Sequence, residues 1–244
     1  IVECYLGGQA GGPASIDVLY GDVNPGGRLA ETFPIKLEDD IVTKWFGMGP
    51  QSVEHRESIY VGYRYYDKAN KNVLFPFGYG LSYTEFDYSD LKISAEKMKD
   101  QDKLDLSFKV KNIGSTYGSE VAQIYVKDIK STIFRPDKEL KAFKKIYLQP
   151  GEEQTVQISL DARAFSFYNI NINDWYVESG EFELLIGSSS RDIHLNASVE
   201  IEATVEAQIM DYQSTAPEYF DLSQQVMSIS TSSFEALLGR KVIK

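Results

Sequence analysis

The chain is poor in the residues that build disulfides and metal sites. It has one cysteine, Cys4, and two histidines, His55 and His194, in 244 residues. A single cysteine forms no internal disulfide, and so few cysteines and histidines argue against a Cys/His metal cluster. We therefore expect no redox chemistry, no metal and no cofactor. A lone thiol also favours a reducing compartment such as the cytoplasm, and a secreted or periplasmic location stays open.

Basic charge and long apolar runs are also scarce. The chain has 36 acidic and 25 basic residues, which gives a formal net charge of -11. Such a charge opposes binding to nucleic-acid phosphates and to anionic lipid heads. No run approaches the roughly 18 consecutive apolar residues of a membrane helix, and no signal segment opens the chain. We expect neither nucleic acid nor membrane as a partner. Because the chain starts at Ile1 without an initiator methionine, we also expect upstream sequence to be missing.

Hydrophobic residues, in contrast, make up 43% of the chain and aromatic residues 13%. This content is enough for one large or two modest cores. Leu104, Leu106, Phe108 and Val110 alternate with polar residues, as in a strand with one buried face. Further strand candidates lie at 122–126, 140–148, 156–160, 182–186 and 193–201. About seven short strands without cysteine predict an immunoglobulin-like or fibronectin type III-like β-sandwich.

The segments on either side of these strands have other patterns. Residues 14–20 predict a short apolar helix that ends at Gly21. Residues 41–89 are rich in Tyr, Phe and Gly without a regular period, which predicts a long ordered loop laid across a surface. Residues 203–244 lose the alternation and predict an extended tail or linker, in which residues 234–238 could start a helix that Gly239 stops.

Glycine and aromatic residues gather in motifs that carry a family resemblance. The first motifs are GGQAGGPA at 7–14, DVLYGDVNPGGRL at 17–29 and TFP at 32–34. The next are RESIYVGYRYYD at 56–67, LFPFGYGLSYT at 74–84 and GSEVAQIYV at 118–126. Over about residues 3–200, this order resembles the end of the second domain of glycoside hydrolase family 3 and the sandwich that follows it.

The resemblance implies a mainly β fold with four parts. Residues 1–40 would be the remnant of an α/β sandwich domain and 41–89 an aromatic connecting loop. Residues 90–202 would be the fibronectin type III-like sandwich, and 203–244 a tail or linker towards a further domain. The tail favours a domain order in which the barrel domain of the family follows the sandwich. A tail docked on its own sandwich would have the same sequence pattern.

The resemblance also implies an activity for the complete enzyme. Its members are β-glucosidase-like retaining hydrolases of β-linked glycosides, whose two reactive carboxylates lie about 5 to 5.5 Å apart. One is an Asp on a barrel domain, and the other is commonly a Glu ahead of the glycine-rich motif. Neither matches a position here, so we assign no catalytic residue and expect the chain alone to be inactive. The implied partner is the barrel-containing catalytic portion of the same enzyme.

Two alternatives from other classes stay open. A carbohydrate-binding or adhesion module would use the same sandwich with an exposed aromatic platform, and a protein-interaction sandwich would share only the shape. A homo-oligomer is also left open.

Five residues are candidates for a place near substrate. Arg56 and Glu57 are charged residues in an aromatic segment and could form a partly desolvated network, although a salt bridge that anchors the segment to the α/β domain is favoured. His55 could hydrogen-bond a sugar hydroxyl, with an ordinary surface or structural role favoured. Trp45 and Phe46 could stack on a pyranose ring, whereas interdomain packing explains most other aromatic residues of the loop.

One position departs from the family pattern. The arginine–glutamate pair is usually followed by glycine, and here Ser58 follows Glu57. If the backbone needs a positive φ at this position, serine is strained where glycine is not.

Overall fold

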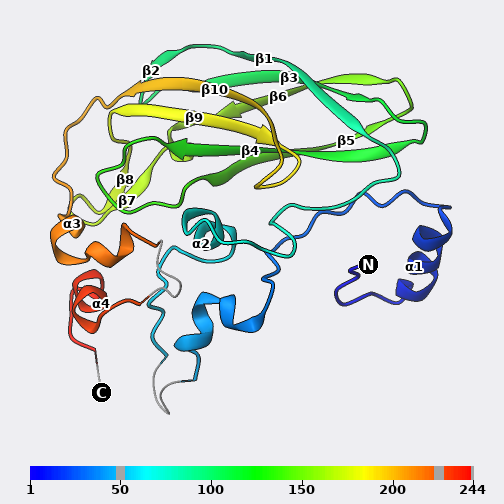
Figure 1. The fold of residues 1–244 in the computed structure, drawn as a ribbon. Helices are drawn as coiled ribbons and strands as arrows, with labels where there is room; N and C mark the ends of the chain where they lie inside the picture. The colour runs from blue at the N-terminus through cyan, green and yellow to red at the C-terminus, as the bar shows by residue number, and fades with distance from the viewer. Residues whose placement is uncertain (48–52, 223–227, 243–244) are drawn as a thin grey trace.

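Two β-sheets packed face to face form the main body of the chain. The computed structural model describes residues 1–47, 53–222 and 228–242 (Figure 1). One sheet has the order β1 (Phe86–Ile93), β3 (Leu104–Asn112) and β6 (Glu153–Leu160). The other has the order β2 (Lys97–Lys99), β10 (Ile193–Glu202), β9 (Gly180–Gly187), β4 (Gly118–Asp128) and β5 (Glu139–Leu148). The predicted mainly β sandwich is confirmed.

The strands pair antiparallel in both sheets, except that β2 runs parallel to β10. A separate hairpin joins β7 (Phe167–Asn169) to β8 (Asp174–Tyr176). The six strand candidates from the sequence all lie within observed strands. β1, β2, β7 and β8 were not predicted. In β1 a bulge between Ser89 and Lys92, with Asp90 at φ 56°, interrupts the alternation that would have revealed the strand.

The main core fills the space between the two sheets. In β3, Leu104, Leu106, Phe108 and Val110 are buried, as the alternation predicts. From the facing sheet, β4 adds Ala122, Ile124 and Val126, β9 adds Phe182, Leu184 and Ile186, and β10 adds Val199 and Ile201. Burial of each large apolar side chain contributes roughly 1.5–3 kcal/mol to the stability of the fold. This core therefore stabilises the sandwich without a disulfide.

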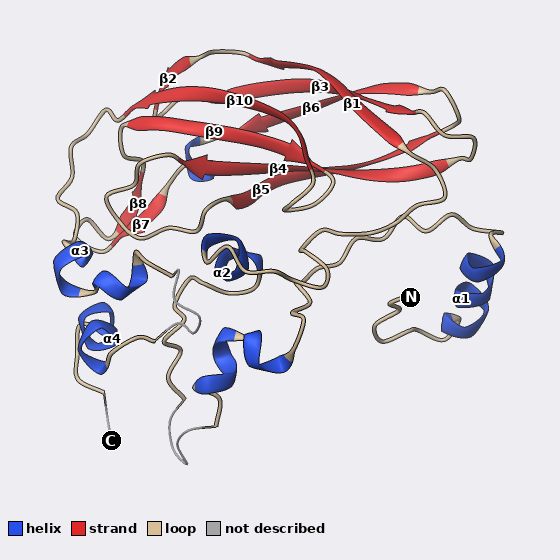
Figure 2. Cartoon of the chain, viewed as in Figure 1, coloured by secondary structure: helices blue, strands red, loops and turns tan. Residues whose placement is uncertain are grey.

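The helices are short, and most lie outside the sandwich. They are α1 (Gly11–Tyr20), η1 (Leu37–Asp39), η2 (Ile41–Lys44), α2 (Tyr63–Lys68), η3 (Ala162–Ala164), α3 (Tyr212–Thr215), η4 (Pro217–Tyr219) and α4 (Thr231–Leu238). Figure 2 shows α1, α2, α3 and α4 on the same side of the sandwich, below it in this view. α1 ends at Gly21 and α4 at Gly239, both left-handed with φ of 83° and 64°. These two helix ends are confirmed predictions.

The tail is folded against the aromatic segment. A second core joins Tyr60, Tyr65 and Phe134 with tail residues that include Tyr219 and Phe234. Phe134 comes from the connection between β4 and β5, and its ring stacks on that of Tyr219 with centroids 4.8 Å apart. Residues 203–222 and 228–242 therefore take part in the fold of the chain, while a further domain beyond them stays a prediction.

Candidate functional site

Arg56 joins the aromatic segment to the last part of the chain. Its side chain is buried, and Nε donates a 2.6 Å hydrogen bond to the Glu54 carboxylate. Nη1 donates to the carbonyl oxygen of Ile229 at 2.8 Å, and Nη2 to Oγ1 of Thr231 at 3.1 Å. A buried guanidinium needs a partner for its charge, which Glu54 supplies. The internal salt bridge of Arg56 thus lies within its own segment, and the two other hydrogen bonds of the guanidinium join that segment to the tail.

Two aromatic rings also contact this guanidinium. Its central carbon lies 4.5 Å from the ring centroid of Trp45 and 5.5 Å from that of Phe234. Such cation–π contacts contribute about 0.5–2 kcal/mol, more as the cation is desolvated. Phe46, the next residue after Trp45, is 80% exposed. The structure therefore places Trp45 against Arg56 and leaves the Phe46 ring accessible.

Glu57 and His55 form a pair of their own. The Glu57 side chain is buried, and its Oε1 lies 3.0 Å from Nδ1 of His55. The imidazole itself is 78% exposed. A carboxylate beside one ring nitrogen fixes the ring orientation and leaves the other nitrogen free to meet a hydroxyl group. This geometry is compatible with the predicted role of His55, which stays a prediction.

The backbone after this pair is strained. Ser58 has φ 52°, in the left-handed region that favours glycine. The strain expected from the departure at this position is confirmed. Conformations of this kind persist where the surrounding contacts determine the backbone, and they are frequent at ligand sites.

Two buried tyrosines are linked by hydrogen bonds to the backbone just before Ser58. The Tyr219 hydroxyl donates to the carbonyl oxygen of Arg56 at 2.8 Å, and the Tyr60 hydroxyl donates to the carbonyl oxygen of Tyr219 at 2.6 Å. Burial raises the pKa of both phenols well above the usual range. Both hydroxyls therefore stay protonated as donors over the whole physiological range.

A second interface fastens the N-terminal motif to the sandwich. Arg28 Nη2 lies 2.7 Å from Oε2 of Glu120, and both side chains are buried. Leu29 donates to the carbonyl oxygen of Tyr79 and accepts from the backbone N–H of Gly78, each at 2.9 Å. The glycine-rich turn and the 74–84 motif thus pair with each other and lie together on β4.

Side chains of Asn24 and Gln123 complete this interface. Asn24 donates to the carbonyl oxygen of Tyr117 and accepts from the backbone N–H of Tyr83. Gln123 on β4 donates to the carbonyl oxygen of Gly78 at 3.2 Å. Tyr125, also on β4, lies edge-on to the ring of Tyr63 on α2. β4 is therefore buried on both of its faces, one by the core and one by the aromatic segment.

Ion pairs fix α2 on the same sheet. Asp67 lies 3.0 Å from Nζ of Lys138 and 2.8 Å from Nε of Arg191. Glu139 on β5 is 3.1 Å from both Arg64 and Lys141. Burial opposes ionisation of Glu139, but the surrounding cations outweigh it and hold its pKa below the usual value. These carboxylates serve as structural anchors.

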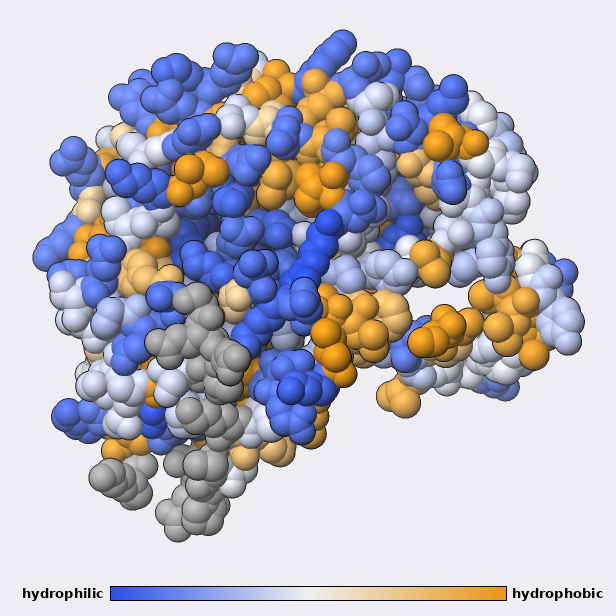
Figure 3. All heavy atoms as spheres, viewed as in Figure 1, coloured by the Kyte–Doolittle hydropathy of each residue, from blue (hydrophilic) through white to orange (hydrophobic). Residues whose placement is uncertain are grey.

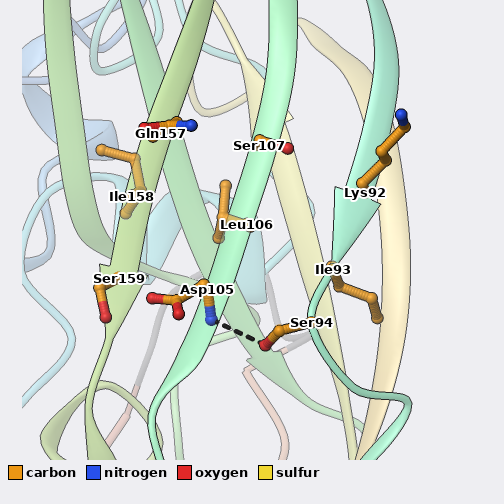
Figure 4. Close-up of a pocket in the computed structure, with 9 residues that line it drawn as sticks. All are labelled: Lys92, Ile93, Ser94, Asp105, Leu106, Ser107, Gln157, Ile158 and Ser159. Carbon is orange, nitrogen blue, oxygen red and sulfur yellow. Dashed lines mark hydrogen bonds between the residues drawn. The ribbon is translucent and has the colours of Figure 1, made fainter.

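The hollow on the open face of β1, β3 and β6 does not supply the two carboxylates of a retaining glycosidase. Figure 4 shows its lining, with Lys92, Ile93 and Ser94 on one side and Gln157, Ile158 and Ser159 on the other. Asp105 is the one carboxylate among these lining residues, and its backbone N–H donates a hydrogen bond to Oγ of Ser94 at 3.0 Å. A retaining glycosidase needs two acids at one sugar. This surface therefore lacks the pair.

The described residues also lack a metal-binding cluster and a membrane-spanning helix. No group of three or more His, Cys, Asp or Glu side chains within residues 1–47, 53–222 and 228–242 could hold a metal ion. Across those same ranges, every helix is too short or too polar to pass through a bilayer.

Comparison with known families connects these interfaces to an enzyme class. Residues 1–83 match the glycosyl hydrolase family 3 C-terminal domain, and residues 120–190 match the fibronectin type III-like domain. The chain belongs to glycoside hydrolase family 3. Both matched segments contribute to the Arg28–Glu120 interface, so the two family 3 domains meet in this chain at a buried ion pair.

Individual family 3 relatives cover nearly the whole chain. Thermostable beta-glucosidase B of Acetivibrio thermocellus is 49% identical over 98% of this chain and 31% of its own length. An exo-alpha-(1->6)-L-arabinopyranosidase of Bifidobacterium breve is 40% identical over 90% of this chain and 28% of its own. The crystal structure of a family 3 beta-glucosidase of Bifidobacterium adolescentis superposes with a TM-score of 0.80 at 37% identity, covering 91% of this chain and 32% of that one.

The chain thus spans about a third of the length of these relatives. Its matched residues correspond to the C-terminal domain and the fibronectin type III-like domain of the family. Sequence reasoning identified Arg56, but it missed Thr231, Phe234 and Tyr219 as its partners. No periodicity or spacing links residues so far apart, and only the apolar character of the tail could have suggested that the tail packs on the chain.

Proposed function

We propose that this chain is the docking portion of a retaining glycoside hydrolase acting on β-glucosides or related β-glycosides. The single observation that carries the proposal is the uncovered apolar surface of α1, which has no buried residue. Ile16, Leu19 and Tyr20 expose 51%, 61% and 80% of their surface. Figure 3 shows hydrophobic surface gathered over α1. Apolar patches of this kind mark interaction sites.

The partner that fits this patch is the catalytic portion of the same enzyme, with its barrel domain. The patch lies in the segment that matches the family 3 C-terminal domain, so the remainder of that domain is its natural cover. From there the Arg28–Glu120 interface leads directly to the sandwich. The sandwich then acts as a buttress, and the two reactive carboxylates come from the catalytic portion.

An activity assay tests the proposal. The complete enzyme and this chain alone are incubated with an aryl β-glucoside, and release of the aryl alcohol is followed. We expect turnover by the complete enzyme and none by the chain alone. Robust turnover by the isolated chain would show that both carboxylates lie within it, contrary to the proposal.

The preferred sugar is tested with a substrate panel. Two of the three relatives described above are named beta-glucosidases and one is named an arabinopyranosidase. We infer a β-glucoside, and expect the complete enzyme to have a higher kcat/KM for the aryl β-glucoside than for the β-xyloside or the α-L-arabinopyranoside. A reversed order would assign a different sugar and leave the docking role intact.

One observation bears on the rival function of a carbohydrate-binding module. Tyr168 and Trp175 on the β7–β8 hairpin are each 45% exposed. Their rings are 72° apart, and the Arg163 guanidinium lies over Trp175. A flat sugar-stacking platform needs coplanar, open faces, which this pair does not offer. Titration of the chain with cello-oligosaccharides checks this, and saturable binding would favour the rival.

A cytoplasmic location is also proposed. Cys4 is an exposed free thiol, and such thiols persist where the compartment keeps them reduced. Fractionation of the source cells followed by the aryl β-glucoside assay checks the proposal. Activity confined to the medium or periplasm would contradict it.

A further inference from the structure

The outer face of β5 continues the interface between the N-terminal motif and the sandwich. On β4, Ser119 lies so close to Gly26 that a Cβ atom at Gly26 would overlap the serine hydroxyl. Further along β4, Gln123 donates to the carbonyl oxygen of Gly78 at 3.2 Å. Both of these outward positions are therefore covered by the segment that matches the family 3 C-terminal domain.

Strand pairing places two exposed aromatic residues beside the covered positions. In the register of β4 and β5, Tyr147 is opposite Ser119, and Phe143 is opposite Gln123. Residues directly opposite each other in an antiparallel pair lie on the same face of the sheet. Phe143 and Tyr147 are nevertheless 66% and 57% exposed. The outer face of the sheet is thus covered over β4 and open over β5.

Lys145 links the open part of this face to the covered part. It lies two residues from each ring along β5, so its side chain leaves the strand on the same side. Its Nζ donates to the carbonyl oxygen of Gly26 at 2.9 Å and lies 5.8 Å from the ring centroid of Tyr147. An ammonium group has three donors, so Lys145 can also bond to an acceptor on a partner.

The charge of β5 argues against a second copy of the chain as the cover. β5 is the edge strand of its sheet, and Lys144 and Lys145 are exposed neighbours on it. Lysines on an edge strand oppose pairing with another edge. A twofold contact through this face would also bring the lysine-bearing strands of two copies together, and like charges repel.

We propose that the outer face of β5, with Phe143, Lys145 and Tyr147, is a second docking surface for the rest of the family 3 C-terminal domain of the same enzyme. The inference rests on the proposed function, in which that part of the enzyme covers α1. Figure 1 shows α1 below β4 and β5, on the same side of the sandwich. A partner that covers α1 and continues past residues 24–28 meets β5 next, because Gly26 contacts both Ser119 and Lys145.

The second surface gives the sandwich a defined orientation in the enzyme. Contacts on both sides of residues 24–28 restrict the angle between the C-terminal domain and the sandwich more than the α1 contact alone. The partner surface should offer apolar atoms to the two rings and an oxygen acceptor to the Lys145 ammonium.

Hydroxyl-radical footprinting of the complete enzyme tests the proposal. Tyr168 on β7 is the matched internal control for Tyr147, because both are tyrosines and Tyr168 is 45% exposed. On an open face, Tyr147 would be oxidised at least as fast as Tyr168. We expect Tyr147 to be oxidised about fivefold more slowly, since the centre of an interface excludes water. Tyr20 on α1 reports on the first docking surface in the same sample.

A pair of variants of the complete enzyme provides an independent measurement. Exchange of an exposed side chain for alanine has little effect on stability, whereas the loss of interface rings weakens the contact. The double variant Phe143→Ala/Tyr147→Ala should unfold about tenfold faster than wild type at elevated temperature, as followed by fluorescence. Tyr168→Ala should unfold within about twofold of the wild-type rate.

The outcomes separate this inference from the proposed function. If Tyr20 is protected but Tyr147 is oxidised as fast as Tyr168, the β5 surface is wrong and docking through α1 stands. If neither Tyr20 nor Tyr147 is protected, the docking function and this inference both fall. Protection of Tyr147 that disappears on dilution to monomers would assign the face to a second copy and overturn the proposal. Equal unfolding rates of the double variant and Tyr168→Ala would also contradict it.

Discussion

Two buried arginines show how single residues hold distant segments of this chain together. Arg28 binds Glu120 across the interface between the N-terminal motif and β4. Arg56 binds Glu54 within its own segment, and its Nη1 and Nη2 groups donate hydrogen bonds to the tail. Loss of one partner of a buried ion pair costs about 3–5 kcal/mol, because a charge is left without compensation. Arginine suits both positions because its planar fork donates in several directions at once.

Ser58 is predicted to be a position where glycine improves stability. Replacement of Ser58 by glycine removes the left-handed strain of about 1–2 kcal/mol but adds flexibility to the unfolded chain, for a net gain of about 0.5–1 kcal/mol. Urea denaturation of the chain measures this gain. Ser58→Ala keeps the Cβ atom and should bring none. A loss of stability in Ser58→Gly would mean that the serine side chain makes a contact worth more than the strain.

At the residue scale, the sequence predicted the local structure only where a residue belonged to a recognisable motif. The strain at Ser58 could be foreseen because one residue departs from a pattern. The contacts of Arg56 could not, since Ile229 lies 173 residues away and offers only its backbone carbonyl. A backbone acceptor carries no residue-type signal.

At the scale of elements, β4 organises the molecule. Its inward residues Ala122, Ile124 and Val126 enter the core, and its outward residues Gln123 and Tyr125 are covered by the aromatic segment. Strands buried on both faces lose the simple alternation of one-sided strands. Long strands with one buried face, such as β3, were predictable, whereas three-residue strands such as β2 are too short for any period to be recognised.

Gly80 is predicted to control how closely the 74–84 motif approaches the glycine-rich turn. A Cβ atom at Gly80 would lie 2.4 Å from the carbonyl oxygen of Gly27, a backbone atom that no side-chain rotation can move. Gly80→Ala should therefore destabilise the chain by about 1–3 kcal/mol, as for other overpacked sites. Equilibrium unfolding in urea gives the value.

Gly27→Ala is the matched control for this experiment. A Cβ atom at Gly27 has no neighbour within 4 Å, so the change in stability should stay within about 0.5 kcal/mol. Equal effects of the two substitutions would show that backbone flexibility, rather than close approach, explains the glycine at position 80.

At the scale of the whole molecule, the described residues form two cores that meet through the connection between β4 and β5. The sandwich core is built from strands, and the second core joins the aromatic segment to the tail. The sequence predicted the first core because its apolar residues alternate. It did not predict the second, because Ala216, Tyr219, Leu222, Ile229 and Phe234 are spaced without a period among Ser, Gln and acidic residues. A segment with that composition resembles a linker until its partner surface is known.

Removal of the tail is predicted to release the aromatic segment and spare the sandwich. In a chain that ends at Glu202, Tyr60, Tyr65 and Phe134 lose their cover, each at a cost of roughly 1.5–3 kcal/mol. Hydrogen exchange should then show faster exchange at residues 54–60, while β3 and β4 keep their protection because the core of the sandwich is unchanged. A separate peptide of residues 203–244, added in excess, should restore the slow exchange. If residues 54–60 are equally protected with and without the tail, the second core does not determine their conformation, and the aromatic segment is held by its contacts with β4 alone.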